Sequence, residues 1–181
     1  DAANYYVSNI RLVPTSGTDV VYDTVLLITA SNAGQPYSLG ELPVGEYQTI
    51  KFDIGVDSAR NHSDPSTYAV SHPLYPQSPS MHWSWSSGYI FLRFEGQIDT
   101  TATLSGPTVN YEYHIGMDNL RKEVSIPIVL NVDAYTHTII ANIDLLMGTV
   151  INGLNLKTAA DVSTHTMDNL PLANTVITNT Q

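Results

Sequence analysis

Alternating apolar and polar positions recur along most of the chain and predict a protein built mainly from short β-strands. The clearest alternation lies at residues 47–54, where Ile50, Phe52 and Ile54 are separated by single polar residues. Successive side chains of a strand point to opposite faces, so these three are expected to bury one face while the other meets water. Further strands are expected at residues 4–13, 20–29, 89–97, 109–115, 123–132 and 137–143.

A few segments depart from this strand pattern. One helical turn is expected at residues 57–62, and Asp144 is expected to cap a short helix that ends at Met147. The tail predicts an amphipathic helix, because its apolar residues recur at helical spacing. These residues are Leu170, Ala173, Val176 and Ile177. Many short strands with few helices favour an all-β fold, an antiparallel, Greek-key-like β-sandwich in one domain over residues 1–181.

Residues 57–80 have no periodicity and form a long loop rich in proline and histidine. Its prolines and histidines are His62, Pro65, His72, Pro73, Pro76 and Pro79. Long ordered loops in compact domains usually carry function, and proline lowers the entropy lost when such a loop is held in place.

The composition excludes several classes of partner and site. The 181 residues carry 7 basic and 17 acidic side chains, a formal net charge of −10, which would repel nucleic acid or an anionic membrane surface. The absence of cysteine rules out disulfides, thiolate nucleophiles and cysteine-based metal sites. No run of about 18 apolar residues occurs, so no transmembrane segment is expected.

Motifs of hydrolytic or nucleotide chemistry are missing, which favours a binding protein over an enzyme. The six histidines include no pair at zinc-peptidase helical spacing, and there is no Gly-x-Ser-x-Gly elbow or phosphate-binding glycine loop. Metal-capable and aromatic side chains are densest at His62, His72, Met81, His82, Trp83 and Trp85. Imidazole and thioether donors suit copper, although paired tryptophans are equally typical of a core and loop histidines of a surface.

Several short motifs occur in order along the chain. They are residues 7–12, 45–47 with 52–57, 61–65, 72–74, 81–92 and 113–116. The paired tryptophans followed by Gly88-Tyr89 are the most specific part. This series resembles the MbnP-like family, which includes bacterial copper-binding proteins of the periplasm and outer membrane.

The resemblance implies a β-sandwich with a mononuclear copper site, in which two imidazoles and a tryptophan oxidised to kynurenine hold the ion. Carried over to this sequence, the ligands are His62 of the Asn-His motif and His114 of the His-Ile-Gly motif. Trp83 or Trp85 is the oxidisable tryptophan, and the sequence leaves that choice open. Two further histidines, His82 and His72, are additional ligand candidates.

Two neutral imidazoles favour Cu(I), which needs few ligands and tolerates an open position. Oxidation of tryptophan requires a partner, which the resemblance gives as a dihaem protein of the peroxidase type. The family also implies a periplasmic or outer-membrane, cell-surface location for copper acquisition or handling. We expect any lipid-anchoring residue to lie upstream of Asp1.

The alternative is a metal-free ligand-binding or structural domain of an envelope lipoprotein. The 11 tyrosines and two tryptophans would then form a stacking surface for a glycan or peptide. That hypothesis predicts Trp83 and Trp85 exposed on a concave face, whereas the copper hypothesis predicts that the ring nitrogens of His62 and His114 converge.

Overall fold

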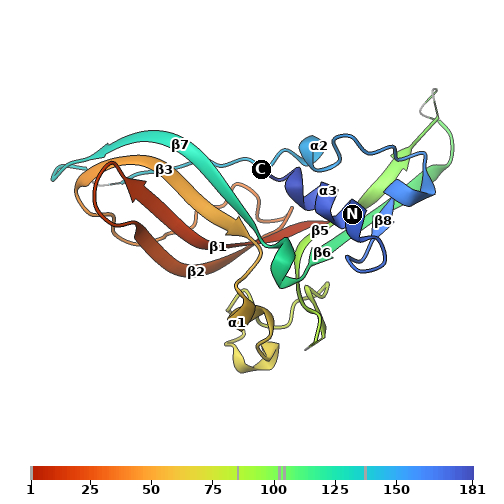
Figure 1. The fold of residues 1–181 in the computed structure, drawn as a ribbon, viewed down its shortest axis with the longest axis horizontal. Helices are drawn as coiled ribbons and strands as arrows, with labels where there is room; N and C mark the ends of the chain where they lie inside the picture. The colour runs from red at the N-terminus through yellow and green to blue at the C-terminus, as the bar shows by residue number, and fades with distance from the viewer. Residues whose placement is uncertain (1, 85, 102, 104, 137) are drawn as a thin grey trace.

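The computed structural model describes residues 2–84, 86–101, 103, 105–136 and 138–181, here called the described residues. They form mostly strands (Figure 1). The strands are β1 (Ala2–Pro14), β2 (Val20–Ile28), β3 (Gly45–Ile54), β4 (His82–Ser84), β5 (Gly88–Asp99), β6 (Thr108–Gly116), β7 (Lys122–Val132) and β8 (Ser163–Thr164). The helices are α1 (Ser58–Asn61), α2 (Met147–Val150) and α3 (Leu170–Thr178), with 3-10 turns at Pro65–Thr67, Asp118–Leu120 and Ala159–Asp161.

One long strand, β1, divides the sheet into two wings. Tyr5 of β1 pairs with both β2 and β5, whereas Val7 pairs with both β2 and β3. β5 and β3 therefore take successive stretches of the same edge of β1, opposite β2. The register shifts around Asn9, whose φ of 51° is a left-handed conformation that asparagine tolerates better than most residues.

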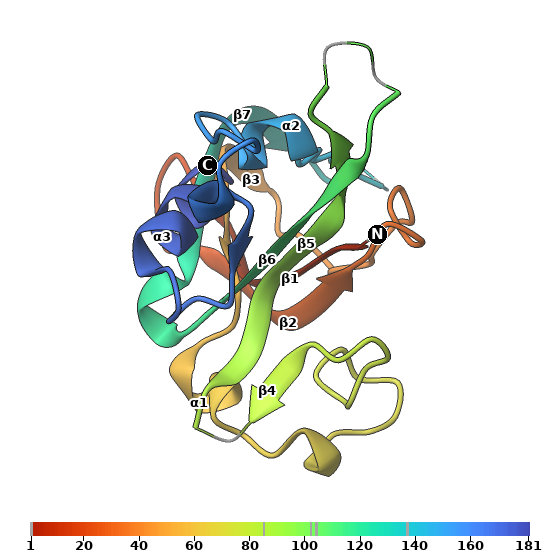
Figure 2. The same cartoon turned by 90° about the vertical axis from the view of Figure 1, so that its right-hand side faces the viewer.

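The first wing contains β2, β1, β3 and β7, and the second contains β5, β6 and β8 (Figure 1), with β4 paired to β5 (Figure 2). Neighbouring strands are antiparallel except β6 and β8, which pair in parallel, and the sheet does not close. The expected all-β sandwich is confirmed, with this one mixed pairing added to the antiparallel arrangement.

The buried core agrees with the alternation in the sequence. Ile50, Phe52 and Ile54 of β3 are all buried, as expected for one face of a strand. In the second wing, Tyr113 and Ile115 of β6 are fully buried, and α3 packs against that strand. The predicted tail helix is confirmed as α3, which buries Ala173, Val176 and Ile177 in the same core. Of its leucines, Leu172 is buried there, whereas the predicted Leu170 is only partly buried.

The loop of residues 57–80 is ordered and lies beside β4, below the sheet in Figure 2. Its helical turn is confirmed as α1, which the side chain of Asp57 caps by accepting from the backbone N of Arg60 at 3.0 Å. The hydroxyl of Tyr89 donates to the carbonyl of Leu74 at 2.6 Å, which anchors the loop to β5.

Two expectations near residue 140 are wrong. Residues 138–143 form no strand, and His137 lies outside the described residues. β7 ends at Val132, and the Asp133 carboxylate then accepts from the backbone N of Tyr135 at 2.9 Å in a turn that follows the strand. The short helix is α2, which begins at Met147 instead of ending there and has Leu146, not Asp144, at its N-cap.

Candidate metal centre

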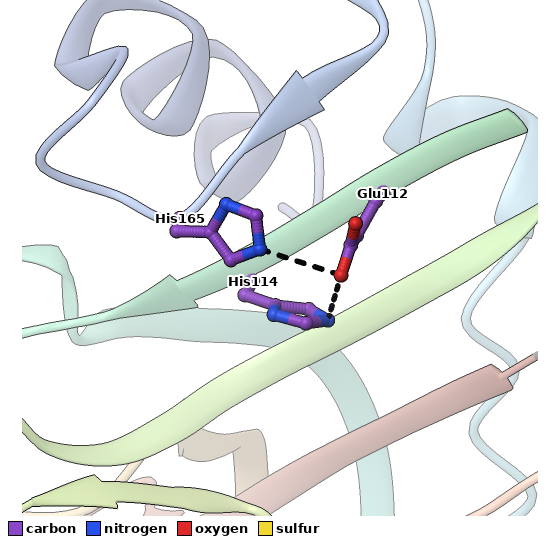
Figure 3. Close-up of side chains that lie close together, drawn as sticks. All are labelled: Glu112, His114 and His165. Atoms are coloured by element: carbon purple, nitrogen blue, oxygen red, sulfur yellow. Dashed lines mark hydrogen bonds and ion pairs between the residues drawn. The ribbon is translucent and has the colours of Figure 1, made fainter.

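Three metal-capable side chains converge on one face of the second wing: Glu112, His114 and His165 (Figure 3). Glu112 and His114 are alternate residues of β6, so they project from the same face. β8 pairs in parallel with β6 at Glu112↔Ser163, and continuing that register brings His165 beside His114. One ligand atom from each side chain lies within 4.8 Å of the others.

The shared point of the cluster is a carboxylate oxygen. Glu112 Oε1 lies 3.3 Å from His114 Nε2 and 3.3 Å from His165 Nε2. The two imidazole rings meet edge to face, with centroids 4.8 Å apart. The His114 side chain is 10% exposed, against 43% for Glu112 and 44% for His165, so the cluster has one buried member and two that face solvent.

A turn after β8 holds His165 in this place. Thr166 is buried and has a φ of 67°. Its hydroxyl donates to the carbonyl of His114 at 2.8 Å and accepts from the backbone N of Gly116 at 3.0 Å. This single side chain therefore fastens the turn to the edge of β6, directly beside one of the candidate ligands.

Asp168 orients the His165 ring. Its Oδ1 accepts from the backbone N of His165 at 2.7 Å, and its Oδ2 lies 3.1 Å from Nδ1 of the same ring. Burial alone would raise the pKa of Asp168, but these hydrogen bonds and one from Thr164 outweigh it and lower that pKa. An ionised Asp168 favours the tautomer with its proton on Nδ1, which leaves Nε2 free to bind a metal.

Glu95 and Arg93 of β5 support the other side of the cluster. They lie opposite Glu112 and His114 in the β5–β6 register. Glu95 makes a short contact with Nε2 of His114 and a two-point ion pair with Arg93, at 2.7 and 3.1 Å. Burial opposes ionisation of Glu95, but the hydrogen bonds from Arg93 and His114 prevail and lower its pKa.

Of the predicted ligands, only His114 lies in this cluster. The Nε2 of His62 is 3.3 Å from Asp118 Oδ2, and Asp118 Oδ1 accepts from the side-chain amide of Asn61 at 2.7 Å. His62 is not a member of the group of ligand atoms around His114 within the described residues. Sharing of one ion between His62 and His114 therefore stays a prediction.

His72 and His82 lie along the proline-rich loop and β4. The Nδ1 of His72 accepts from the backbone N of Leu74 at 3.1 Å, so that nitrogen is already engaged. Burial lowers the pKa of His82, and its Nε2 is buried without a hydrogen-bond partner among the residues that the structure describes. Neither ring belongs to the cluster at His114.

Trp83 lies on the same face of β6 as the candidate ligands. It is partly buried, and a Cβ atom on Gly116 would come within 2.7 Å of its Cζ3. Gly116 is two residues beyond His114, so the indole occupies the next position along this row. Trp85 lies outside the described residues, so the exposure of both indoles stays a prediction.

Sequence reasoning missed Glu112 and His165. The Glu-x-His alternation within the predicted strand at residues 109–115 was a local signal that could have found Glu112. No local signal points to His165, which is 53 residues from Glu112 and joins it only through the β6–β8 pairing.

Fold and cluster together define the class of this protein, an open β-sandwich with a candidate metal centre on its second wing. The family model for MbnP matches residues 1–168, so the chain belongs to the MbnP family. Among solved structures it is similar to MbnP from Methylosinus trichosporium, with 18% sequence identity and a TM-score of 0.44. That match covers 74% of this chain and 61% of the other, so the chain spans about three fifths of that structure's length. No curated protein matches the chain.

Proposed function

We propose that this protein binds copper outside the cytoplasm, at a mononuclear site formed by Glu112, His114 and His165. The observation that carries the proposal is the convergence of one ligand atom from each of these side chains within 4.8 Å. Membership of the MbnP family supports the choice of copper and of a periplasmic or cell-surface location. None of the described helices is long and apolar enough to cross a membrane.

Two imidazoles and one carboxylate are suitable ligands for copper. Imidazole is a common copper ligand, and copper stands above the other divalent first-row metals in affinity for a given nitrogen and oxygen site. His114 is anchored in the sheet, whereas Glu112 and His165 face solvent, so an ion can enter and leave from one side. These features suit a protein that acquires or hands over copper rather than one that catalyses a reaction.

Trp83 is the described tryptophan that fits a maturation step. Its ring packs over Gly116, next to His114 in the row of side chains on β6. Oxidation to kynurenine would replace an indole, which has only an N–H donor, by a group with an amine and a carbonyl. A dihaem partner of the peroxidase type would carry out that oxidation, as the family resemblance implies.

The test is a copper titration of the purified protein in competition with a chromophoric chelator. Wild-type protein is compared with His114→Ala, His165→Ala and His62→Ala. We expect one tight site per chain, weakened about 100-fold or more in the first two variants and unchanged in His62→Ala. His62 is the matched control because its contact with Asp118 is also a solvent-exposed histidine–carboxylate pair.

The opposite pattern identifies the alternative ligand set. If His62→Ala abolishes binding and His165→Ala does not, the copper site is the pair predicted from the sequence. If no copper binds, with or without oxidation of tryptophan, the copper function is wrong and the metal-free binding module becomes the better account.

A further inference from the structure

We infer that the cluster of Glu112, His114 and His165 selects a divalent ion, Cu²⁺ or Zn²⁺, over Cu⁺. The inference rests on the proposed function for the place of the site and goes further by naming the charge of the ion. It differs from the Cu(I) expectation, which considered two imidazoles without a carboxylate.

Two of the three separations within the cluster match those around a bound ion of ordinary size. Bonds of about 2.0–2.1 Å in tetrahedral geometry place neighbouring ligand atoms about 3.3 Å apart. Glu112 Oε1 lies 3.3 Å from both His114 Nε2 and His165 Nε2. To present these three atoms to one ion, Nε2 of His114 must exchange its short contact with Glu95 for the ion.

The contacts of the two ring nitrogens of His165 leave one of them able to bind a cation. Both nitrogens of this ring face carboxylate oxygens, Nδ1 facing Asp168 and Nε2 facing Glu112. A neutral imidazole has a single N–H, and the contact with Asp168 Oδ2 at 3.1 Å favours having it on Nδ1. The lone pair of Nε2 then faces an anionic oxygen of Glu112, an arrangement that a metal ion between them would satisfy.

The charges around the site favour two positive charges over one. Three carboxylates (Glu112, Glu95 and Asp168) and one guanidinium (Arg93) lie around the two imidazole rings, and their formal charges sum to −2. A divalent ion neutralises this charge, whereas Cu⁺ leaves one negative charge uncompensated. The carboxylate is also a hard oxygen ligand, which suits Cu²⁺ and Zn²⁺ better than Cu⁺.

The test compares three ions on the same protein: Cu²⁺ and Zn²⁺ under air, and Cu⁺ under anaerobic conditions, each against a chelator of known affinity. Glu112→Gln removes one charge while keeping the shape of the side chain, and Glu46→Gln, at an exposed position of β3, is the matched control. We expect Glu112→Gln to weaken Cu²⁺ and Zn²⁺ by about 100-fold and Cu⁺ by less than about threefold, with the control unchanged.

Two further measurements keep the test independent of folding and of other donors. Circular dichroism of the metal-free variants establishes that each is folded, and electron paramagnetic resonance of the Cu²⁺ form should show coupling to two imidazole nitrogens. Met167→Leu removes the exposed thioether two residues beyond His165, a soft donor that Cu⁺ would recruit. We expect this variant to leave Cu²⁺ and Zn²⁺ binding unchanged.

The outcomes separate this inference from the proposed function. Tight Cu⁺ binding without Cu²⁺ or Zn²⁺ binding overturns the inference and leaves the copper function standing. Zn²⁺ binding that depends on Glu112, without copper in either state, supports the divalent site and overturns the copper function. Equal losses for all three ions in Glu112→Gln show that the charge of the carboxylate does not select the ion, which also overturns the inference.

Discussion

Asp168→Asn tests whether the orientation of His165 matters for metal binding. In the native protein Asp168 Oδ2 lies 3.1 Å from Nδ1 of His165, and Oδ1 accepts from that residue's backbone N at 2.7 Å. The asparagine keeps an oxygen for the backbone contact but places an NH₂ donor opposite Nδ1. The ring then gains by moving its proton to Nε2, the nitrogen that would bind the ion.

The expected loss follows from the role of such supporting carboxylates. Changing a residue that orients a metal-binding histidine typically costs 10–100-fold in affinity, or about 1.4–2.7 kcal/mol. Folding should suffer less, about 1 kcal/mol, because the Asp168 side chain is 54% exposed and the asparagine oxygen still accepts from the backbone N of His165. The measurements are a metal competition titration and urea unfolding of the metal-free protein, with Glu46→Gln as the control for lost charge.

Affinity within about twofold of wild type in a folded Asp168→Asn protein would refute this reasoning, because it would mean that Nε2 of His165 is not a ligand. A parallel loss of affinity and of most of the folding free energy would instead show that Asp168 acts by holding the turn together.

Three further predictions concern the support of the site. Gly116→Ala should destabilise the fold by about 1–3 kcal/mol in urea unfolding, since its Cβ would lie 2.5 Å from the backbone oxygen of Tyr89; unchanged stability would contradict the packing. Thr166→Val should cost about 1–3 kcal/mol by the same assay, because the carbonyl of His114 loses its hydroxyl partner; a neutral effect would show that the turn is held otherwise. The lowered pKa of Glu95 contributes stability that is complete above the unfolded carboxyl pKa of about 4 and is lost as the pH falls through the folded pKa. Glu95→Gln should therefore lower the free energy of unfolding at pH 7 and make this free energy fall less steeply as the pH is lowered, as measured by unfolding at several pH values. An unchanged pH dependence in acid would count against the contact with His114.

Much of the fold could be predicted because strand and helix patterns are local. In residues 49–52 partly exposed and buried side chains alternate as the sequence predicts, whereas Tyr47 and Asp53, on the face predicted to meet water, are buried as well. The pattern of α3 is also local, because its apolar stripe repeats every three or four residues. His114 was found as a candidate ligand through a short motif on one strand, which is also local information.

The sequence by itself determined the strand content, the tail helix, the net charge and the absence of cysteine chemistry. Only the tertiary structure decided how β1 divides the sheet, why residues 138–143 form no strand, and that His165 joins Glu112 and His114. Strand pairing depends on which distant segments compete for an edge, and the β6–β8 pairing brings together Glu112 and His165, which are 53 positions apart. Local periodicity carries no information on which distant strands pair, so it can identify the ligands on one strand but not the partner that completes the site.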